Sequence, residues 1–231
     1  MNLIRELVGV GQNEQAREAW VEKTLGALPR GWKILDAGTG TTRHRKYCAH
    51  LAYTSRDFCQ YDGTGDGRGL HTHSVDHGRI DIVSDIAAIP VPDASFDTVL
   101  RTEVLEHVPD PVLGEFGRIV RPGGRLIVTA PFASHTHIAP YSYATGFSRY
   151  WYEHHRTQKG FRVDELSTTG DWYGVLRQEL TRLPSMSCSR VARLALETVA
   201  AIGVRVQRRL SRDAGAADLA CFRPHCVTTR T

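Results

Sequence analysis

The sequence predicts an α/β fold built on a mostly parallel sheet. Short apolar runs bounded by turn residues alternate with stretches of helix-like apolar spacing, which is the pattern of βαβ units. A glycine-rich turn at residues 36–41 directly follows the first of these apolar runs, and open α/β sheets bind ligands at such turns. Hydrophobic residues make up 41% and charged residues 23% of the chain, so a globular core is expected and a disordered or fibrous architecture is excluded.

Each predicted element rests on its apolar spacing and on the residues that end it. Apolar residues three or four positions apart predict helices, and Pro111 suits the first position of one of them. The predicted helices cover residues 13–28, 42–51, 110–120, 172–183 and 190–210. Short apolar runs closed by Asp, Gly or Pro predict buried strands. The predicted strands cover residues 32–35, 53–58, 80–83, 95–100, 125–130, 161–166 and 217–228.

The chain is expected to form one domain over residues 1–231, because α/β domains often exceed 200 residues without dividing. The expected parts are a helical lead-in at 1–30, a core at 31–170, a helical insertion at 171–216 and the last strand at 217–231. A loop rich in Gly, Asp and His at residues 61–79 interrupts the core, and loops of this length often carry function.

Charge and cysteine content restrict the partners and the location. The formal net charge is +4, but basic residues are dispersed outside residues 190–212, so a nucleic-acid partner is not expected. The five cysteines are odd in number and contain no C-x-x-C pair, which predicts reduced thiols in a cytoplasmic protein. Residues 1–21 lack the apolar core of a signal peptide, and no run approaches the 18 apolar residues of a spanning helix.

The turn at residues 36–41 is the strongest local indication of a ligand site. Its glycines let the backbone approach a ligand at the end of the first strand. A dinucleotide site needs a third glycine where Arg43 stands, so a nicotinamide cofactor is disfavoured. Asp36 precedes the first glycine and would repel a pyrophosphate, but it favours a ligand that carries positive charge. An ordinary tight turn remains the alternative.

Asp57 ends the second predicted strand, seventeen positions after Gly40. A carboxylate at this place can accept hydrogen bonds from both hydroxyls of a ribose. The alternative is an Asp that starts a turn, which is a frequent role of this residue type.

Four stretches resemble the motifs of class I S-adenosylmethionine-dependent methyltransferases, in the type 11 small-molecule branch. They are residues 35–41 (LDAGTGT), the segment of Asp85-Ile86, Ile89-Pro90 and Ser95-Phe96-Asp97, residues 102–108 (TEVLEHV) and residues 118–124 (RIVRPGG). The resemblance implies a Rossmann-like, mostly parallel seven-stranded sheet with an antiparallel last strand, helices on both faces and a helical insertion before that strand. It also implies S-adenosylmethionine bound over the ends of the first, second and fourth strands.

The resemblance assigns a part of this cofactor to each matching position. The methionine part would be held by Asp36, Gly38, Thr39 and Gly40, the ribose by Asp57, and the adenine by Asp85 and Ile86. Phe58 would cover the adenine and Thr102 would line the floor of the site. The loop after the second strand is longer than is usual in the family, which puts Phe58 in doubt.

Residues 137–155 are similar to a subgroup found with glycan and natural-product biosynthesis, so the expected acceptor is a small molecule with a hydroxyl. His137 follows the fifth strand and is the candidate general base, with His107 second; a structural histidine is the alternative for His107. The predicted acceptor pocket is lined by Tyr141, Arg149, Tyr150 and His154, with a packed helical cap as the alternative.

The loop histidines and the basic segment at residues 190–212 each have a functional and a structural interpretation. His71, His73 and His77 could bind a metal, but no Cys or carboxylate cluster matches them, so a solvated loop and no metal site are expected. Residues 190–212 form a basic amphipathic helix that suits an anionic membrane, yet packing on its own domain or on a second copy in a homo-oligomer is favoured. A non-catalytic binding module and a methyltransferase of macromolecules stay open as alternative functions.

Overall fold

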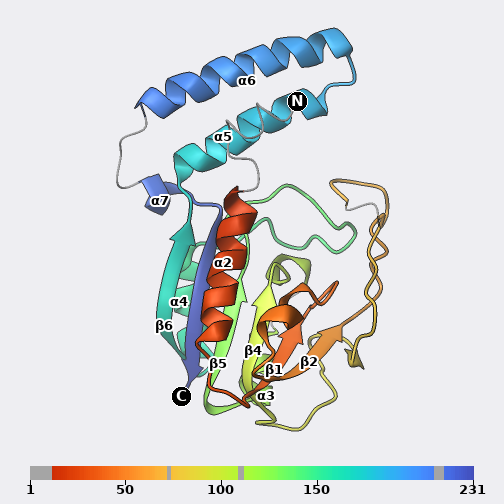
Figure 1. The fold of residues 1–231 in the computed structure, drawn as a ribbon, viewed down its shortest axis with the longest axis vertical. Helices are drawn as coiled ribbons and strands as arrows, with labels where there is room; N and C mark the ends of the chain where they lie inside the picture. Colours follow the sequence, from red (N-terminus) through yellow and green to blue (C-terminus); the bar gives the residue numbers. More distant parts are fainter. Residues whose placement is uncertain (1–11, 72–73, 109–111, 211–215) are drawn as a thin grey trace. The chain divides into compact units, whose positions relative to one another are not determined.

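The described strands form one seven-stranded sheet with the order β3-β2-β1-β4-β5-β7-β6 (Figure 1). The structure is a computed structural model that describes residues 12–71, 74–108, 112–210 and 216–231. The strands are β1 (Lys33–Ala37), β2 (Ala52–Asp57), β3 (Ile82–Val83), β4 (Phe96–Thr102), β5 (Val120–Thr129), β6 (Phe161–Thr169) and β7 (Arg223–Arg230). Neighbours from β3 to β5 pair in parallel, whereas β7 pairs antiparallel with β5. The predicted sheet and its antiparallel last strand are confirmed.

Four of the five predicted helices agree with the structure over most of their length, whereas the helix at residues 149–158 was not predicted. They are α2 (Gln12–Gly26), α3 (Leu113–Ile119), α4 (Arg149–Gln158), α5 (Trp172–Arg182), α6 (Arg190–Leu210) and α7 (Ala216–Leu219), with 3-10 turns η1 (Arg43–Tyr47), η2 (Leu105–His107) and η3 (Leu183–Met186). The α6 bounds agree with the predicted helix 190–210. The expected helix start at Asp110 and Pro111 lies outside the described residues. None of the helices in the described part of the chain is long and apolar enough to cross a membrane.

Two predicted elements are wrong. The expected helix 42–51 is only the short turn η1, because Thr42 adopts left-handed backbone with φ 56° and the turn carries four charged or His residues out of five. The expected strand 217–228 begins late, since residues 216–219 form α7 and β7 starts at Arg223.

Alternation of side chains along the strands builds two cores on opposite faces of the sheet. One core joins Leu35, Val99 and Leu126 to the helix residues Phe116 and Tyr152. The other joins their sequence neighbours Ile34, Leu100 and Ile127 to Val21 and Leu25 of α2. Because successive strand residues point to opposite faces, strands buried on both sides need continuous apolar runs. Helices therefore cover both faces, as predicted (Figure 1).

The described chain divides into two compact units. The larger contains residues 20–167 and 223–231, and the smaller contains residues 12–19 and 168–222. Within the smaller unit α5 lies beside α6, where Arg177 Nη1 donates a 3.0 Å hydrogen bond to Gln207 Oε1. The predicted insertion at 171–216 falls inside this unit, and the one-domain organisation stays a prediction. All predicted site residues belong to the larger unit.

Candidate functional site

The turn after β1 forms the centre of the candidate site. Gly38 has φ +98°, and a Cβ there would lie 2.5 Å from Val104 Cγ2, so only glycine allows this approach. The Gly38 and Thr39 amides donate to the carbonyl of Arg56 at 2.8 and 3.2 Å, which fixes the turn against β2. Gly40 faces open space at the position of a missing Cβ. The backbone at the end of β1 is therefore held in place and accessible.

Asp36 lies beneath this turn and is 1% exposed. Its Oδ2 accepts hydrogen bonds from Tyr53 Oη at 2.8 Å and from Thr39 Oγ1 at 3.0 Å. Its Oδ1 is buried and accepts none. Burial raises the pKa of Asp36, although His44, whose Nδ1 lies 3.9 Å from Oδ2, opposes the rise. The free oxygen is thus suited to a donor that carries positive charge.

Asp57 joins the ends of β1 and β2. Its Oδ2 accepts the Gly40 amide at 2.9 Å, and its Oδ1 accepts the Cys59 amide at 3.0 Å. The charge of Asp57 also contributes to the raised pKa of Asp36. The structure therefore brings the two predicted carboxylates to one place, with the glycine turn between them.

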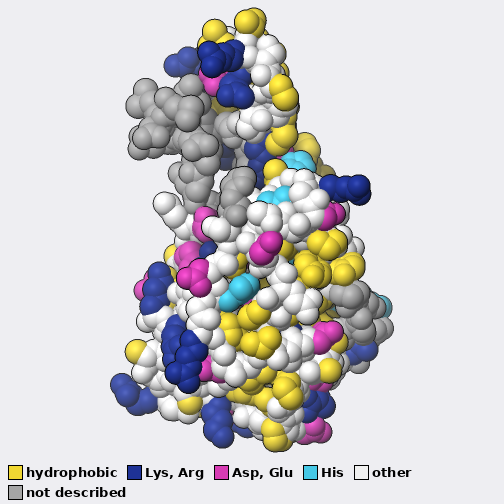
Figure 2. Space-filling model, turned by 90° about the vertical axis from the view of Figure 1, so that its right-hand side faces the viewer, with side chains coloured by type: hydrophobic (Ala, Val, Ile, Leu, Met, Phe, Trp, Pro, Cys, Tyr) yellow, Lys and Arg dark blue, Asp and Glu magenta, His cyan; other side chains and the backbone are white. Residues whose placement is uncertain are grey.

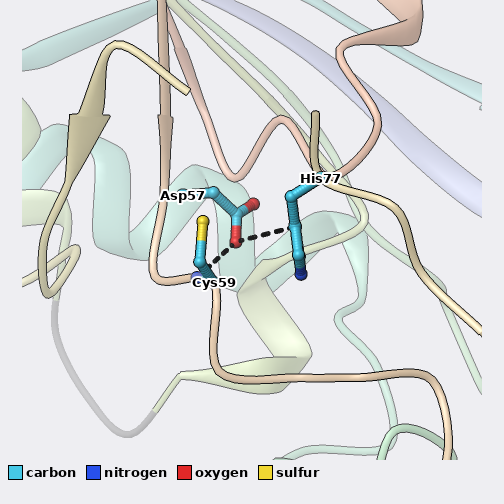
Figure 3. Close-up of side chains that lie close together, drawn as sticks. All are labelled: Asp57, Cys59 and His77. Atoms are coloured by element: carbon cyan, nitrogen blue, oxygen red, sulfur yellow. Dashed lines mark hydrogen bonds and ion pairs between the residues drawn. The ribbon is translucent and has the colours of Figure 1, made fainter. Parts of the chain in front are cut away.

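His77 also reaches Asp57, as Figure 3 shows. Its Nδ1 lies 3.8 Å from Asp57 Oδ1, and its Nε2 is 3.0 Å from the carbonyl of Tyr61. The donor atoms of Asp57, Cys59 and His77 all lie within 4.8 Å of one another. The expectation that no carboxylate or cysteine accompanies the loop histidines is wrong for His77. His71 instead contacts Tyr61, with 2.9 Å between Nδ1 and Oη, and His73 lies outside the described residues.

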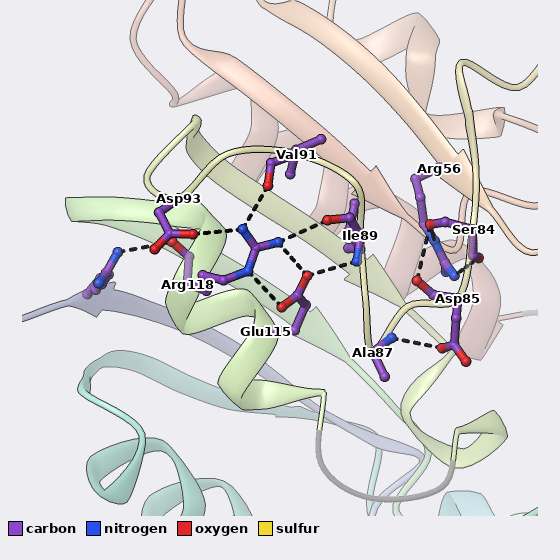
Figure 4. Close-up of polar contacts among 10 residues, drawn as sticks. Arg56, Ser84, Asp85, Ala87, Ile89, Val91, Asp93, Glu115 and Arg118 are labelled. Carbon is purple, nitrogen blue, oxygen red and sulfur yellow. Dashed lines mark hydrogen bonds and ion pairs between the residues drawn. The ribbon is translucent and has the colours of Figure 1, made fainter.

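The predicted adenine-side segment is fixed by a network of polar contacts (Figure 4). Asp85 Oδ1 accepts the Ala87 amide at 2.8 Å, and Ile86 is buried beside it. Further along, Arg118 of α3 donates to the carbonyls of Ile89 at 2.9 Å and Val91 at 2.7 Å. The Arg118 side chain is held by Glu115 and Asp93, and Glu115 also accepts the Ile89 amide. The residues of α3 therefore hold the segment 89–91, and the Asp85 carboxylate fixes the local turn to Ala87.

A second group of side chains gathers at the ends of β4 and β5. Glu106 is 1% exposed, and Oε1 of its carboxylate lies 3.7 Å from His107 Nε2 and 3.9 Å from His137 Nε2. The two imidazole rings are 4.5 Å apart. The long loop supports this arrangement, because Leu70 exchanges backbone hydrogen bonds with Thr136 and Ile138 on either side of His137. The two predicted general-base candidates therefore meet at a buried carboxylate.

Burial dominates the electrostatics of this group. It raises the pKa of Glu106 to about 8, and the charge of Glu103 adds to the rise. Burial also lowers the pKa of His107 to about 4, against a hydrogen bond to the Tyr141 carbonyl that raises it. Sequence reasoning did not select Glu106 as a site residue. Its position beside His107 in residues 102–108 was the only available indication.

The other predicted residues fall into two groups. Tyr141 and Phe58 meet at the histidines: Tyr141 accepts from His107 through its carbonyl, and the rings of Tyr141 and Phe58 are 5.0 Å apart. Thr102 is buried at the end of β4. By contrast, Tyr150 on α4 is 72% exposed, Arg149 pairs with Glu153 at 3.3 Å, and His154 is exposed. The structure brings Tyr141 to His107 and Phe58 against the Tyr141 ring, but it leaves Arg149, Tyr150 and His154 of α4 exposed.

The chain is similar to known methyltransferases. Residues 35–128 match the family model described as a methyltransferase domain. The chain is 32% identical over 148 residues to a demethylmenaquinone methyltransferase of Renibacterium salmoninarum, covering 61% of this chain and 56% of that protein. It is 49% identical over 120 residues to 27-O-demethylrifamycin SV methyltransferase of Amycolatopsis mediterranei. This match covers 49% of this chain and 44% of that protein. The matches therefore span about half the length of these curated relatives.

Among solved structures, the fold is shared with phosphoethanolamine N-methyltransferase 2 of Haemonchus contortus in complex with S-adenosyl-L-methionine. The TM-score is 0.53 at 16% sequence identity, over 96% of this chain and 52% of that chain. At this identity the likeness shows the fold alone.

Proposed function

Because residues 35–128 belong to a class I S-adenosylmethionine-dependent methyltransferase domain, we propose that the chain transfers a methyl group from S-adenosylmethionine to a hydroxyl of a small molecule such as a sugar or another natural product. The observation that carries the proposal is the junction of Asp36, Gly40 and Asp57 at the ends of two neighbouring strands. The acceptor assignment draws support from the 27-O-demethylrifamycin SV methyltransferase, whose name places the methyl group on oxygen.

The residues at this junction fit the cofactor. The free Oδ1 of Asp36 can accept a hydrogen bond from the ammonium group of the methionine part, and its charge favours the sulfonium. Both oxygens of Asp57 already accept backbone amides, but each keeps a second lone pair for a ribose hydroxyl. The open space beside Gly40 leaves room for a ligand against the backbone.

The chain contributes mainly by positioning the reactants. S-adenosylmethionine supplies an electrophilic methyl carbon on sulfur, and a nucleophile must approach it in line. The Asp36 turn and the segment 85–91 hold the donor, and the Tyr141 region orients the acceptor. His137 is the candidate that takes the hydroxyl proton: its Nδ1 is 2.9 Å from the His135 carbonyl, which leaves Nε2 as the basic nitrogen, and its side chain is 27% exposed.

Two other functions give different expectations. A module that no longer uses the cofactor would have no reason to keep a buried, half-paired carboxylate at this place. A methyltransferase of nucleic acid would need a continuous basic surface. Figure 2 shows one face of the molecule, on which Lys and Arg side chains are interspersed with acidic, hydrophobic and His side chains.

The test is a transfer assay with methyl-labelled S-adenosylmethionine. The acceptors would be a panel of glycosides, sugar nucleotides and polyketide alcohols, with total RNA and cell protein as separate arms. The expected result is label on oxygen of a small molecule. Label on RNA or protein alone would replace the proposal with a macromolecular function. Cofactor binding without label on any acceptor would favour the binding module.

A further inference from the structure

The side chains of Glu106, His107 and His137 present only hydrogen-bond acceptors to one another. His107 Nδ1 lies 2.6 Å from the carbonyl oxygen of Tyr141, and His137 Nδ1 lies 2.9 Å from that of His135. A neutral imidazole has one N–H, so these contacts place the hydrogen of both rings on Nδ1. The lone pair of each Nε2 atom is then directed at Glu106 Oε1, at 3.7 and 3.9 Å.

This arrangement lacks a positive partner at its centre. Among the described residues, neither oxygen of Glu106 has a hydrogen-bond partner, and the Nε2 atom of His107 has none either. An unpaired buried carboxylate is costly unless a proton or a cation neutralises it. Arg101 and Arg223 act on Glu106 through their charges, but Arg223 forms its ion pair with Glu103 at 3.0 Å. When Glu106 is ionised, the centre between the three side chains is therefore lined by lone pairs.

We propose that Glu106, His107 and His137 bind one divalent transition-metal ion of the Zn²⁺ or Fe²⁺ type. Their donor atoms lie within 4.8 Å of one another, and two imidazoles with one carboxylate are a ligand set for these ions rather than for Mg²⁺ or Ca²⁺. Bonds of about 2.0–2.2 Å put tetrahedral ligands roughly 3.3–3.6 Å apart. The distances of 3.7 and 3.9 Å from Glu106 exceed this range by less than half an ångström, and the donor nitrogens of the two histidines lie within 4.8 Å of each other, so side-chain rotations are needed to close the site.

The neighbouring cluster of Asp57, Cys59 and His77 fits a cation less well. Each oxygen of Asp57 already accepts one backbone amide, so fewer lone pairs remain for a cation than on Glu106. Burial raises the pKa of the Cys59 thiol, and the charge of Asp57 adds to the rise, which opposes the thiolate that a metal requires. In the Glu106 cluster both acceptor nitrogens and both carboxylate oxygens are available.

A metal ion at this place would bind the acceptor of the proposed methyl transfer, so its role rests on the proposed function. Three protein ligands leave at least one coordination position free, as in catalytic metal sites. The partial exposure of His137 gives access to this position from outside. A bound cation would hold an oxygen of the acceptor there, so the preferred acceptor would carry a second oxygen beside its hydroxyl. His137 would then serve as a metal ligand, the cation would lower the pKa of a bound hydroxyl, and the hydroxyl proton would pass to solvent. In the cation-free protein His137 would take this proton.

The test uses the full chain after treatment with a chelator. CoCl₂ is titrated while the visible absorption of Co²⁺ is followed, and ZnCl₂ binding is measured by calorimetry. We expect one equivalent to bind. Glu106→Gln and His137→Gln should each weaken binding at least about 10–100-fold, the loss that even outer partners of a metal site cause. Their thermal midpoints and circular dichroism spectra show whether they fold.

Two variants serve as controls for metal binding, and a titration with S-adenosylhomocysteine tests cofactor binding separately. His135→Gln removes an exposed imidazole from the same loop and keeps the carbonyl that orients His137, so it should bind like the wild type. Cys59→Ser should also bind normally. Loss of binding in Cys59→Ser with retention in Glu106→Gln, or no binding of either ion to the wild type, would overturn the inference. S-adenosylhomocysteine binding without added metal tests the proposed function independently of these outcomes.

Discussion

Asp57 and Glu106 are both buried carboxylates near the ends of parallel strands, but they differ in what surrounds them. Each oxygen of Asp57 accepts a backbone amide, from Gly40 and from Cys59. Neither oxygen of Glu106 accepts a hydrogen bond within the part of the chain that the structure describes. The proposed donor end of the site is therefore organised by the chain itself, whereas at the proposed acceptor end a proton or a cation is needed to neutralise Glu106.

Substitution of Gly38 is expected to have the largest effect on stability, because the turn at Gly38 packs against Val104 and is bonded to β2. Gly38→Ala should destabilise the fold by about 3 kcal/mol, from about 1–2 kcal/mol of left-handed backbone strain and about 1–3 kcal/mol of overpacking against Val104. Chemical denaturation measures the loss. A Cβ at position 40 meets open space, so Gly40→Ala should lower the free energy of unfolding only by the left-handed backbone strain, about 1–2 kcal/mol. Equal stabilities for both variants would show that the close approach to Val104 is unimportant.

Arg118 tests whether α3 holds the adenine side of the donor end. Arg118→Ala removes the donor to two carbonyls and leaves Glu115 without its partner, so we expect a loss of about 1–3 kcal/mol in stability. The matched control is Arg162→Ala, whose 70% exposed side chain pairs with Asp164, and which should cost less than about 1 kcal/mol. Thermal and urea unfolding would compare the two. Similar small losses would mean that the network does not fix residues 89–91.

Asp36 is intermediate between Asp57 and Glu106, because among the described residues one of its oxygens accepts hydrogen bonds and the other does not. Burial raises its pKa, so the stability gained from protonating Asp36 in the fold is fully present below the ordinary value and is lost as pH rises through the raised one. Asp36→Asn stays neutral and should match the wild type in acid but be the more stable protein at neutral pH. Unfolding midpoints of the wild type and of Asp36→Asn, compared from acid to neutral pH, measure this difference in stability. A variant that is less stable at neutral pH would contradict the unpaired state of Oδ1.

The comparison also explains what the sequence could predict. Asp36, Gly40 and Asp57 lie at consecutive strand ends, and parallel strands bring such ends together, so local motifs were sufficient. Glu106 and His137 are separated by thirty residues, and their contact depends on the path of the loops around Leu70 and Tyr141. No periodic pattern encodes such a path.

Failures in secondary structure have a similar cause. The segment 42–51 has few apolar residues for a helix face, and the left-handed Thr42 limits it to one turn. The meeting of His77 with Asp57 depends on how the loop 61–79 folds back over the end of β2. Apolar alternation, in contrast, is repeated along each strand, which is why the sheet and the long helix α6 were predicted well.

Calorimetry with S-adenosylhomocysteine tests the central claim, that two strand-end carboxylates hold one adenosyl ligand. The wild type should bind, and Asp36→Asn and Asp57→Asn should each bind at least about tenfold more weakly, since hydrogen bonds to charged groups contribute about 1.5–3 kcal/mol. Asp66→Asn, an exposed loop variant, should bind like the wild type. Absence of binding to the folded wild type, or equal affinity in all four proteins, would contradict the account.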